Sequence, residues 1–270
     1  MPPRISILMG VYNGEAGLHR AIDSLKAQTY QDWECIICDD GSTDGTWSAL
    51  EKVAQGDERF KLLRNDRNLG LAAALNRCLE IASGEYLARQ DADDVSVPAR
   101  LKVQVEFLDG HPAVTVVGTY AALVDEKGAW WGDIRHPLTP TPWDWVRGAK
   151  VVHASVLMRA HAMREVGGYD TGALRVEDYD LWFRLLAKGA RIVTIPQVLY
   201  FIHWELSDYG RKKFVDRITE VTVRRKGIPA LGVHPISLLY VAKPVLVGLL
   251  PHRLLYLYHL RKLRKRHPPT

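Results

Sequence analysis

The sequence feature that most constrains the fold is an uninterrupted apolar run, Ile5–Val11, close to the N-terminus. A strand that is apolar at every position is buried on both faces, as in the middle of a parallel sheet. The segments that follow alternate between helix-like and strand-like patterns, which predicts a doubly wound, mainly parallel α/β sheet flanked by helices. We expect helices at 18–28, 47–54 and 71–82, and strands at 35–38, 61–64 and 85–89.

From about residue 114 the pattern changes. Expected strands at 114–118, 153–158 and 191–195 are mixed with a tryptophan-rich stretch, and a helix begins near Glu177. We therefore divide the chain into a first half (1–113), a smaller mixed second half of the same domain (114–226) and a basic, helical C-terminal extension (227–270).

The C-terminal extension is apolar first and basic afterwards. Residues 236–250 are interrupted by Lys243 and Pro244, so they do not provide the roughly 20 apolar residues that a membrane-spanning helix needs. Residues 252–266 place leucines on one side of a helix and basic residues elsewhere, which is typical of a helix lying on an anionic membrane. A solvated tail or a partner-binding helix is the alternative.

The net charge of +5 comes from this tail, and the rest of the chain is close to neutral. A nucleic-acid partner is therefore not expected. The first residues do not show the basic region and longer apolar run of a secretory signal. We therefore expect a cytoplasmic protein that contacts the inner face of the membrane peripherally. Cys35 and Cys38 lie three apart on a strand and should point to opposite faces, as reduced buried thiols.

Polar residues stand where the first two strands end. Ligands of parallel sheets bind beyond the carboxyl ends of the strands. Tyr12 follows the first strand and could stack on a base, whereas Asp39 and Asp40 end the second, and a carboxylate could accept the N3–H of uracil or thymine. The alternative is an ordinary surface turn, because Asp, Gly and Ser are common turn residues.

A second acidic cluster, Asp91-Ala92-Asp93-Asp94, follows the strand expected at 85–89. Two carboxylates separated by one residue can hold a divalent ion whose other ligands are phosphate oxygens and water. Such an ion would offset the charge that grows on a diphosphate leaving group. Helix capping would explain one of these acids, but not three in four residues.

A third acidic cluster, Glu177 and Asp178, opens the helix of the second half. A carboxylate placed there could take the proton of an incoming hydroxyl, and compensation of the helix dipole is the alternative. His203 follows a strand-like segment and could reach a phosphate or the metal. His153 fits a packed or surface histidine better.

Taken together, segments 5–13, 39–46, 68–70, 91–93 and 177–178 resemble glycosyltransferase family 2 in order and spacing, and the resemblance extends from residue 5 to about 203. It implies a GT-A fold with a nucleotide-sugar half and an acceptor half. It also implies a metal-dependent (Mn²⁺ or Mg²⁺) transfer of a sugar to a hydroxyl, by one in-line displacement with inversion at the anomeric carbon.

Carried onto this sequence, the resemblance implies a role for each motif. Tyr12 and Asp40 would hold the base with Asp39 beside them, and the segment with Asn68 and Gly70 would run alongside the diphosphate. Asp91 would meet the ribose and share the metal with Asp93 and His203, and Asp178, paired with Glu177, would be the general base. The donor implied is a UDP-sugar, with dTDP-sugar as the alternative because the two bases share an N3–H edge.

Two features of processive family members are missing from the sequence. Neither their Gln-x-x-Arg-Trp motif nor their membrane channel helices occur here. We therefore expect one sugar to be added, to a glycan or lipid-linked acceptor in cell-surface polysaccharide assembly. The alternative is a catalytically silent GT-A-like protein that binds a membrane or protein partner.

Overall fold

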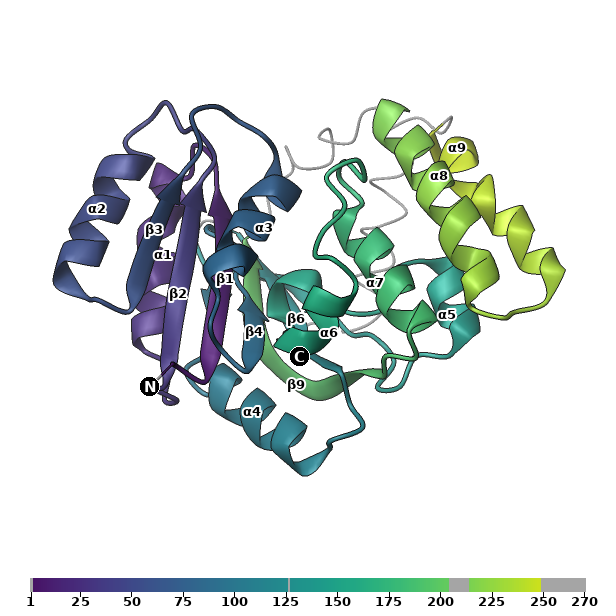
Figure 1. Ribbon diagram of the computed structural model, residues 1–270, viewed down its shortest axis with the longest axis horizontal. Helices are drawn as coiled ribbons and strands as arrows, with labels where there is room; N and C mark the ends of the chain where they lie inside the picture. Colours follow the sequence, from purple (N-terminus) through teal and green to yellow (C-terminus); the bar gives the residue numbers. More distant parts are fainter. Residues whose placement is uncertain (1, 126, 204–213, 249–270) are drawn as a thin grey trace.

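The computed structural model describes residues 2–125, 127–203 and 214–248 of the 270. Its described strands join in one sheet, in the order β3-β2-β1-β4-β8-β6-β9-β5, with β7 paired to β6. Figure 1 shows the side of the sheet that β3, β2, β1 and β4 form. The strands are β1 (Ile5–Val11), β2 (Trp33–Asp39), β3 (Phe60–Arg64), β4 (Tyr86–Arg89), β5 (Val95–Ser96), β6 (Val116–Val124), β7 (Trp130–Ile134), β8 (Leu157–Arg159) and β9 (Ile192–His203).

The first half of the sheet, β3-β2-β1-β4, is entirely parallel. All residues of β1 and β2 are buried, as the apolar run predicts. Their register brings Val11 level with Asp39, so the carboxyl ends of these two strands lie at the same edge of the sheet.

Helices cover both faces of this half. On one face lie α1 (Glu15–Lys26), α2 (Thr46–Gly56) and α4 (Arg100–Gly110), and on the other α3 (Leu71–Ile81), α6 (Ala160–Glu165) and α7 (Glu177–Ala187). Successive residues of β2 alternate between the two cores, so Cys35 packs in one and Cys38 in the other. Both are free thiols, and burial raises the pKa of Cys38 to about 11.

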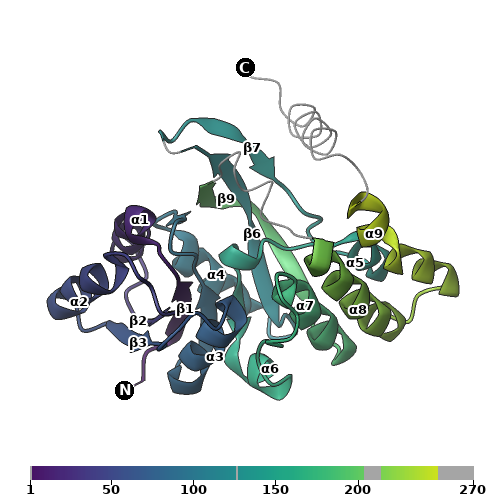
Figure 2. The ribbon, with the colours of Figure 1, turned by 90° about the horizontal axis from the view of Figure 1, so that it is seen from above.

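The second half of the sheet is mixed. β8 runs antiparallel to β4 and β6, β6 and β9 run parallel, and the short β5 pairs antiparallel with β9. The β6–β7 hairpin projects beyond the body of the molecule (Figure 2). The predicted architecture, a parallel first half joined to a mixed second half, is confirmed.

One prediction of secondary structure in this half was wrong, and another was incomplete. Residues 153–158 are not one strand, because η1 (His153–Ser155) is a turn of 3₁₀ helix and the strand begins at Leu157. The strand expected at 191–195 and the strand-like segment before His203 form one strand, β9, in which Pro196 and Gln197 are left out of the pairing with β6 and bulge between the two parts. Proline lacks the N–H that continuous pairing requires.

The C-terminal segments are α8 (Phe214–Ala230), η3 (Pro235–Val241) and α9 (Lys243–Gly248). They pack on the second half, where α8 contacts α7 and η3 contacts α5 (Pro142–Arg147). Helix α8 packs beside α7 and spans residue 227, where the sequence division places the start of the extension (Figure 1). The basic segment 252–266 lies outside the described residues, and within them no helix is long and apolar enough to cross a membrane.

Candidate active site

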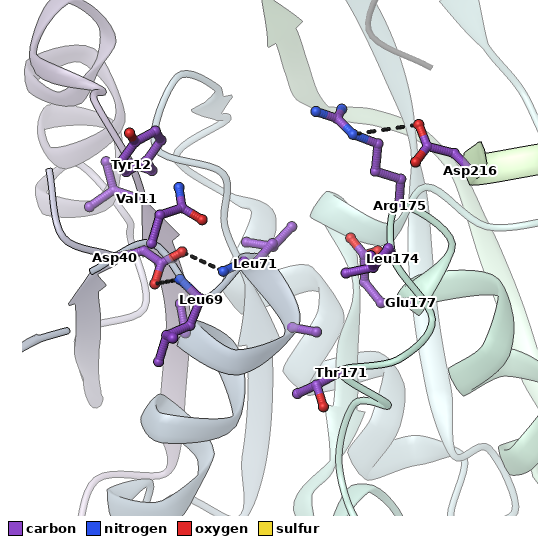
Figure 3. Close-up of a pocket in the computed structure, with 15 residues that line it drawn as sticks. Val11, Tyr12, Asp40, Leu69, Leu71, Thr171, Leu174, Arg175, Glu177 and Asp216 are labelled. Carbon is purple, nitrogen blue, oxygen red and sulfur yellow. Dashed lines mark hydrogen bonds and ion pairs between the residues drawn. The ribbon is translucent and has the colours of Figure 1, made fainter. Parts of the chain in front are cut away.

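A pocket opens between the loops that follow β1 to β3 and the segment that leads into α7 (Figure 3). It lies beyond the carboxyl ends of β1 and β2, where the sequence places the ligand. Its lining residues are Gly10, Val11, Tyr12, Asp40, Asn68, Leu69, Gly70, Leu71, Ala72, Ala74, Thr171, Leu174, Arg175, Glu177 and Asp216.

Asp40 fixes one wall of this pocket. Its carboxylate accepts hydrogen bonds from the Asn65 side chain (2.6 Å) and from the backbone N–H groups of Leu69 (2.9 Å) and Gly70 (2.7 Å). Gly70 has φ +93°, a conformation in which glycine is strongly preferred. The buried carboxylate thus holds the segment that contains Asn68, whose exposed side chain lines the pocket.

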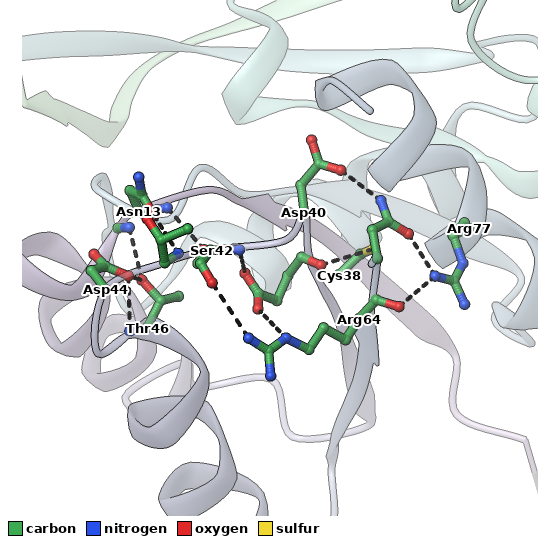
Figure 4. A network of polar contacts seen from close by, with 12 residues as sticks. Asn13, Cys38, Asp40, Ser42, Asp44, Thr46, Arg64 and Arg77 are labelled. Carbon is green, nitrogen blue, oxygen red and sulfur yellow. Dashed lines mark hydrogen bonds and ion pairs between the residues drawn. The ribbon is translucent and has the colours of Figure 1, made fainter. Parts of the chain in front are cut away.

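The loop after β1 is tied to the loop after β2 (Figure 4). The Asn13 N–H donates to Ser42 Oγ (2.9 Å), and its Oδ1 accepts from the Thr43 N–H (2.9 Å). The side-chain bond compensates for the left-handed backbone of Asn13 (φ 49°), which asparagine tolerates better than most residues. The neighbouring Tyr12 ring is consequently held at the pocket, with 48% of its surface exposed.

Asp39 is placed differently from its neighbour. It is fully buried, its Oδ1 accepts from the Ser42 N–H (3.1 Å), and its Oδ2 lies 3.1 Å from Arg64 Nε. It is absent from the pocket lining, so the structure assigns it to support of the 39–46 loop.

Asp91 lies beyond the end of β4 and is ion-paired with Arg89. The Arg89 side chain is 1% exposed and that of Asp91 35% exposed, so a buried guanidinium supports a carboxylate at the surface. A charge-assisted pair of this kind fixes the direction of the carboxylate.

A second buried arginine, Arg100, lies beneath this pair. Its guanidinium donates to the carbonyl oxygens of Arg89 (3.0 Å) and Ala154 (3.1 Å) and lies 5.2 Å from the centre of the Tyr200 ring. Burial lowers its pKa to about 10. The Tyr200 hydroxyl in turn accepts the Asp91 N–H (3.0 Å), which anchors the backbone of the acidic cluster.

The remaining acids of the cluster face in different directions. Asp94 is buried, and its Oδ1 accepts the His203 N–H (2.9 Å), which joins the end of β9 to the cluster. Burial, together with Asp91 and Asp93, raises the pKa of Asp94 well above its usual value. Asp93 is exposed, so it is the carboxylate that can meet a ligand from solvent.

The backbone of His203 contacts this cluster through Asp94. Its ring Nδ1 is buried and has no hydrogen-bond partner among the described residues. Burial, with Arg20 nearby, lowers the pKa of His203 and favours the neutral imidazole, the form that binds metals.

The described residues contain no ready-made group of three or more metal-ligating side chains. Asp91 and Asp93 could contribute to a divalent ion held by one or two carboxylates and the phosphates of a ligand, which is how Mg²⁺ is commonly held and which needs no such group.

Glu177 and Asp178 lie in the first turn of α7, and Glu177 faces the loops after β1 to β3 across the pocket (Figure 3). Asp178 is not among the lining residues and accepts the N–H of Tyr179 on its Oδ1 (2.7 Å). The structure thus places Glu177 opposite Tyr12 and Asp40, with Asp178 next to it along the helix.

Comparison with known proteins decides the family. A family model described as Glycosyl transferase family 2 matches residues 6–164, more than half of the chain. The chain belongs to glycosyltransferase family 2. The putative glycosyltransferase EpsE of Bacillus subtilis (strain 168) is 37% identical to it over 263 residues, which cover 96% of this chain and 94% of EpsE.

Other glycosyltransferases agree with this assignment. The UDP-Glc:alpha-D-GlcNAc-diphosphoundecaprenol beta-1,3-glucosyltransferase WfaP of Escherichia coli is 27% identical, covering 84% of this chain and 88% of WfaP. TarS of S. aureus in complex with UDP-GlcNAc superposes with a TM-score of 0.68 at 18% identity, covering 82% of this chain and 65% of TarS. Mannosyltransferase PcManGT of Pyrobaculum calidifontis, in complex with GDP-Man and Mn²⁺, gives 0.60 at 22% identity, covering 96% and 80%. These structures show the GT-A fold.

Sequence reasoning missed several residues of this glycosyltransferase site. Arg89 and Arg175 stand two residues before Asp91 and Glu177, and a basic residue beside each acidic motif was the available signal. Asp216 reaches the pocket from α8 without any local sequence signal.

His153 is a packed histidine, as its sequence context favours. It is half-buried against α7, with Nε2 2.8 Å from the Tyr169 hydroxyl and its ring 5.8 Å from that of Trp182. Tyr169 exchanges two backbone hydrogen bonds with the side chain of Asn76 on α3, so His153 supports contact between the two halves. Burial, with Arg89 nearby, lowers the pKa of His153 well below its usual value.

This shift predicts a pH dependence of stability. Below about pH 6.5, His153 binds a proton in the unfolded chain but stays neutral in the folded chain. The free energy of unfolding therefore falls as pH falls, by up to about 1.4 kcal/mol per pH unit. His153→Gln removes this loss. Urea unfolding between pH 7.5 and pH 5 should therefore show a shallower decline for the variant. Exposed His19→Gln is the control and should follow wild type, and parallel declines for all three proteins would contradict the prediction.

Proposed function

We propose that this glycosyltransferase moves one sugar from a nucleotide diphosphate, with UDP the preferred nucleotide, to an acceptor hydroxyl with inversion at the anomeric carbon. The observation that carries the proposal is the pocket in which Tyr12, Asp40 and Asn68 face Glu177 across open space. One wall offers groups for a nucleotide, and the other offers a base for an incoming hydroxyl.

For the base, Tyr12 provides a half-exposed aromatic face and Asp40 a carboxylate. Three of the roughly four acceptor positions of Asp40 are occupied by N–H groups, which leaves room for one more donor. The N3–H of uracil or thymine is a donor of this kind, so dTDP-sugars remain the alternative. UDP-Glc in the name of WfaP and UDP-GlcNAc bound to TarS support UDP, whereas PcManGT was solved with GDP-Man.

For the metal, we propose that Asp93, Asp91 and His203 hold Mn²⁺ or Mg²⁺ together with the diphosphate. The exposed Asp93, the Arg89-supported Asp91 and the buried Nδ1 of His203 support this set. A divalent ion supplies charge stabilisation of the leaving diphosphate. PcManGT, a structural neighbour, was solved with Mn²⁺.

For the chemistry, we propose Asp178 as the general base, with Glu177 beside it. The carboxylate takes the hydroxyl proton while the acceptor oxygen bonds to the anomeric carbon. The bond from that carbon to the phosphate oxygen breaks, and its electron pair leaves on the diphosphate. In-line attack from the α7 side inverts the anomeric carbon without a covalent enzyme intermediate.

For the acceptor, we propose a glycan or lipid-linked glycan assembled at the inner face of the membrane, where this cytoplasmic enzyme would bind peripherally. WfaP is named for a diphosphoundecaprenol acceptor, and η3 exposes Ile236, Leu238 and Leu239 (47–72% exposed). The catalytically silent alternative, a partner-binding protein, is distinguished by the experiments below.

The first test is a panel of UDP-, dTDP- and GDP-sugars, each with Mn²⁺, Mg²⁺ or EDTA, with both nucleotide binding and nucleoside diphosphate release recorded. We expect one donor to bind and turn over in a metal-dependent way. Asp93→Ala should reduce both by at least about tenfold, because a metal ligand is lost. Asp32→Ala removes an exposed carboxylate at the opposite edge of the sheet and should behave as wild type. If wild type showed neither nucleotide binding nor turnover, the catalytically silent alternative would be favoured.

The second test separates the base from the binding groups. Asp178→Asn keeps the size of the side chain but cannot accept the proton, so kcat should fall by about 100-fold or more while metal-dependent nucleotide binding stays within about twofold. Glu177→Gln is the matched comparison. If Glu177→Gln abolished turnover and Asp178→Asn did not, Glu177 would be the base, as its position in the pocket lining allows.

A further inference from the structure

Arg175 has an unusual backbone conformation for its place in the pocket. In the described residues, Asn13 and Arg175 are the non-glycine residues with positive φ, and both stand in loops at the pocket. Asn13 has a side-chain hydrogen bond that suits this conformation, whereas arginine at φ 57° is strained. Strain of this kind persists where the surrounding structure holds a residue for a purpose.

The neighbours of Arg175 impose this conformation. Ala173 and Val176 are buried on the second half, and their N–H groups donate to the carbonyl oxygens of Asp170 and Ala173 (both 3.1 Å). Between these two anchors, Leu174 and Arg175 are turned outward into the pocket (Figure 3). The side chain of Arg175 is 54% exposed there.

The charges of the pocket give Arg175 its role. Among the described lining residues it carries the one positive side chain, while Asp40, Glu177 and Asp216 are acidic. Its Nε lies 3.8 Å from Asp216 Oδ2, within ion-pair range but longer than a hydrogen bond. The guanidinium is therefore able to bind an anion that fits it better, and a phosphate group matches its planar set of N–H donors.

We propose that Arg175 binds the diphosphate of the nucleotide donor and exchanges its pairing with Asp216 for the phosphate oxygens. The inference rests on the proposed function, because that donor carries its negative charge on the diphosphate. When the bond to the sugar breaks, the same guanidinium stabilises the charge on the departing diphosphate. Asp216 on α8 is then the counter-charge of Arg175 only while no diphosphate is bound, and it competes with the phosphate for the guanidinium.

The test compares binding of UDP, dTDP and GDP, and of the matching nucleosides, to full-length protein with Mn²⁺. For the nucleoside diphosphate that wild type binds, Arg175→Ala and Arg175→Gly should raise Kd by at least about tenfold, the usual size for a charge-assisted hydrogen bond. The matching nucleoside should change by less than about twofold. Arg175→Gly removes the backbone strain as well as the side chain, so a loss of diphosphate affinity in this variant could not be assigned to the backbone. Arg175→Lys keeps the charge and should show an intermediate Kd.

Asp216→Asn and Arg225→Ala complete the set. Asp216→Asn should bind the diphosphate as tightly as wild type or more tightly, because a competing carboxylate is lost. Arg225→Ala removes an exposed charge of α8 outside the pocket and should match wild type. Unchanged diphosphate binding in Arg175→Ala, or equal losses in Arg175→Ala and Asp216→Asn, would overturn the inference and leave the proposed function intact. No diphosphate binding by wild type would overturn both.

Discussion

One wall of the pocket depends on the buried carboxylate of Asp40. Three N–H donors from Asn65, Leu69 and Gly70 converge on it, and each hydrogen bond to a charged group contributes about 1.5–3 kcal/mol. These bonds join the end of β2 to the segment that leads into α3, so the strand end and the start of the helix behave as one wall. These hydrogen bonds to Asp40 therefore fix the position of Asn68 and of the pocket wall to which it belongs.

Buried Arg89 plays the corresponding role at the acidic cluster after β4. Acids gathered at one edge of a sheet repel one another, and burial penalises their charge further. Arg89 offsets this at Asp91, while the backbone N–H of His203 is bonded to Asp94, whose pKa is raised. A cluster of three acids is thereby divided into an exposed carboxylate, a supported one and an inward one that links β4 to β9.

Sequence alone predicted the parts of this arrangement that are local. The apolar run of β1 and the alternation after it gave the parallel half, and Tyr12, Asp40 and Asn68 fell at the pocket because strand ends share an edge. The bulge at Pro196 and the 3₁₀ turn at His153 were missed, because they depend on pairing with distant strands. The sequence could not show which of Asp39 and Asp40 lines the pocket, because adjacent residues at a strand end can face opposite ways. Asp216 could not be predicted because it reaches the pocket only through the packing of α8 on α7.

The most direct test of the central claim, that these strand ends and α7 form one metal-dependent donor site, is a crystal structure with Mn²⁺ and UDP collected at the manganese absorption edge. We expect one strong anomalous peak between Asp93 and the diphosphate, with the base beside Tyr12 and Asp40. A nucleotide bound away from this pocket, or bound in it with no anomalous peak near Asp93, would show that the site is not formed in this way.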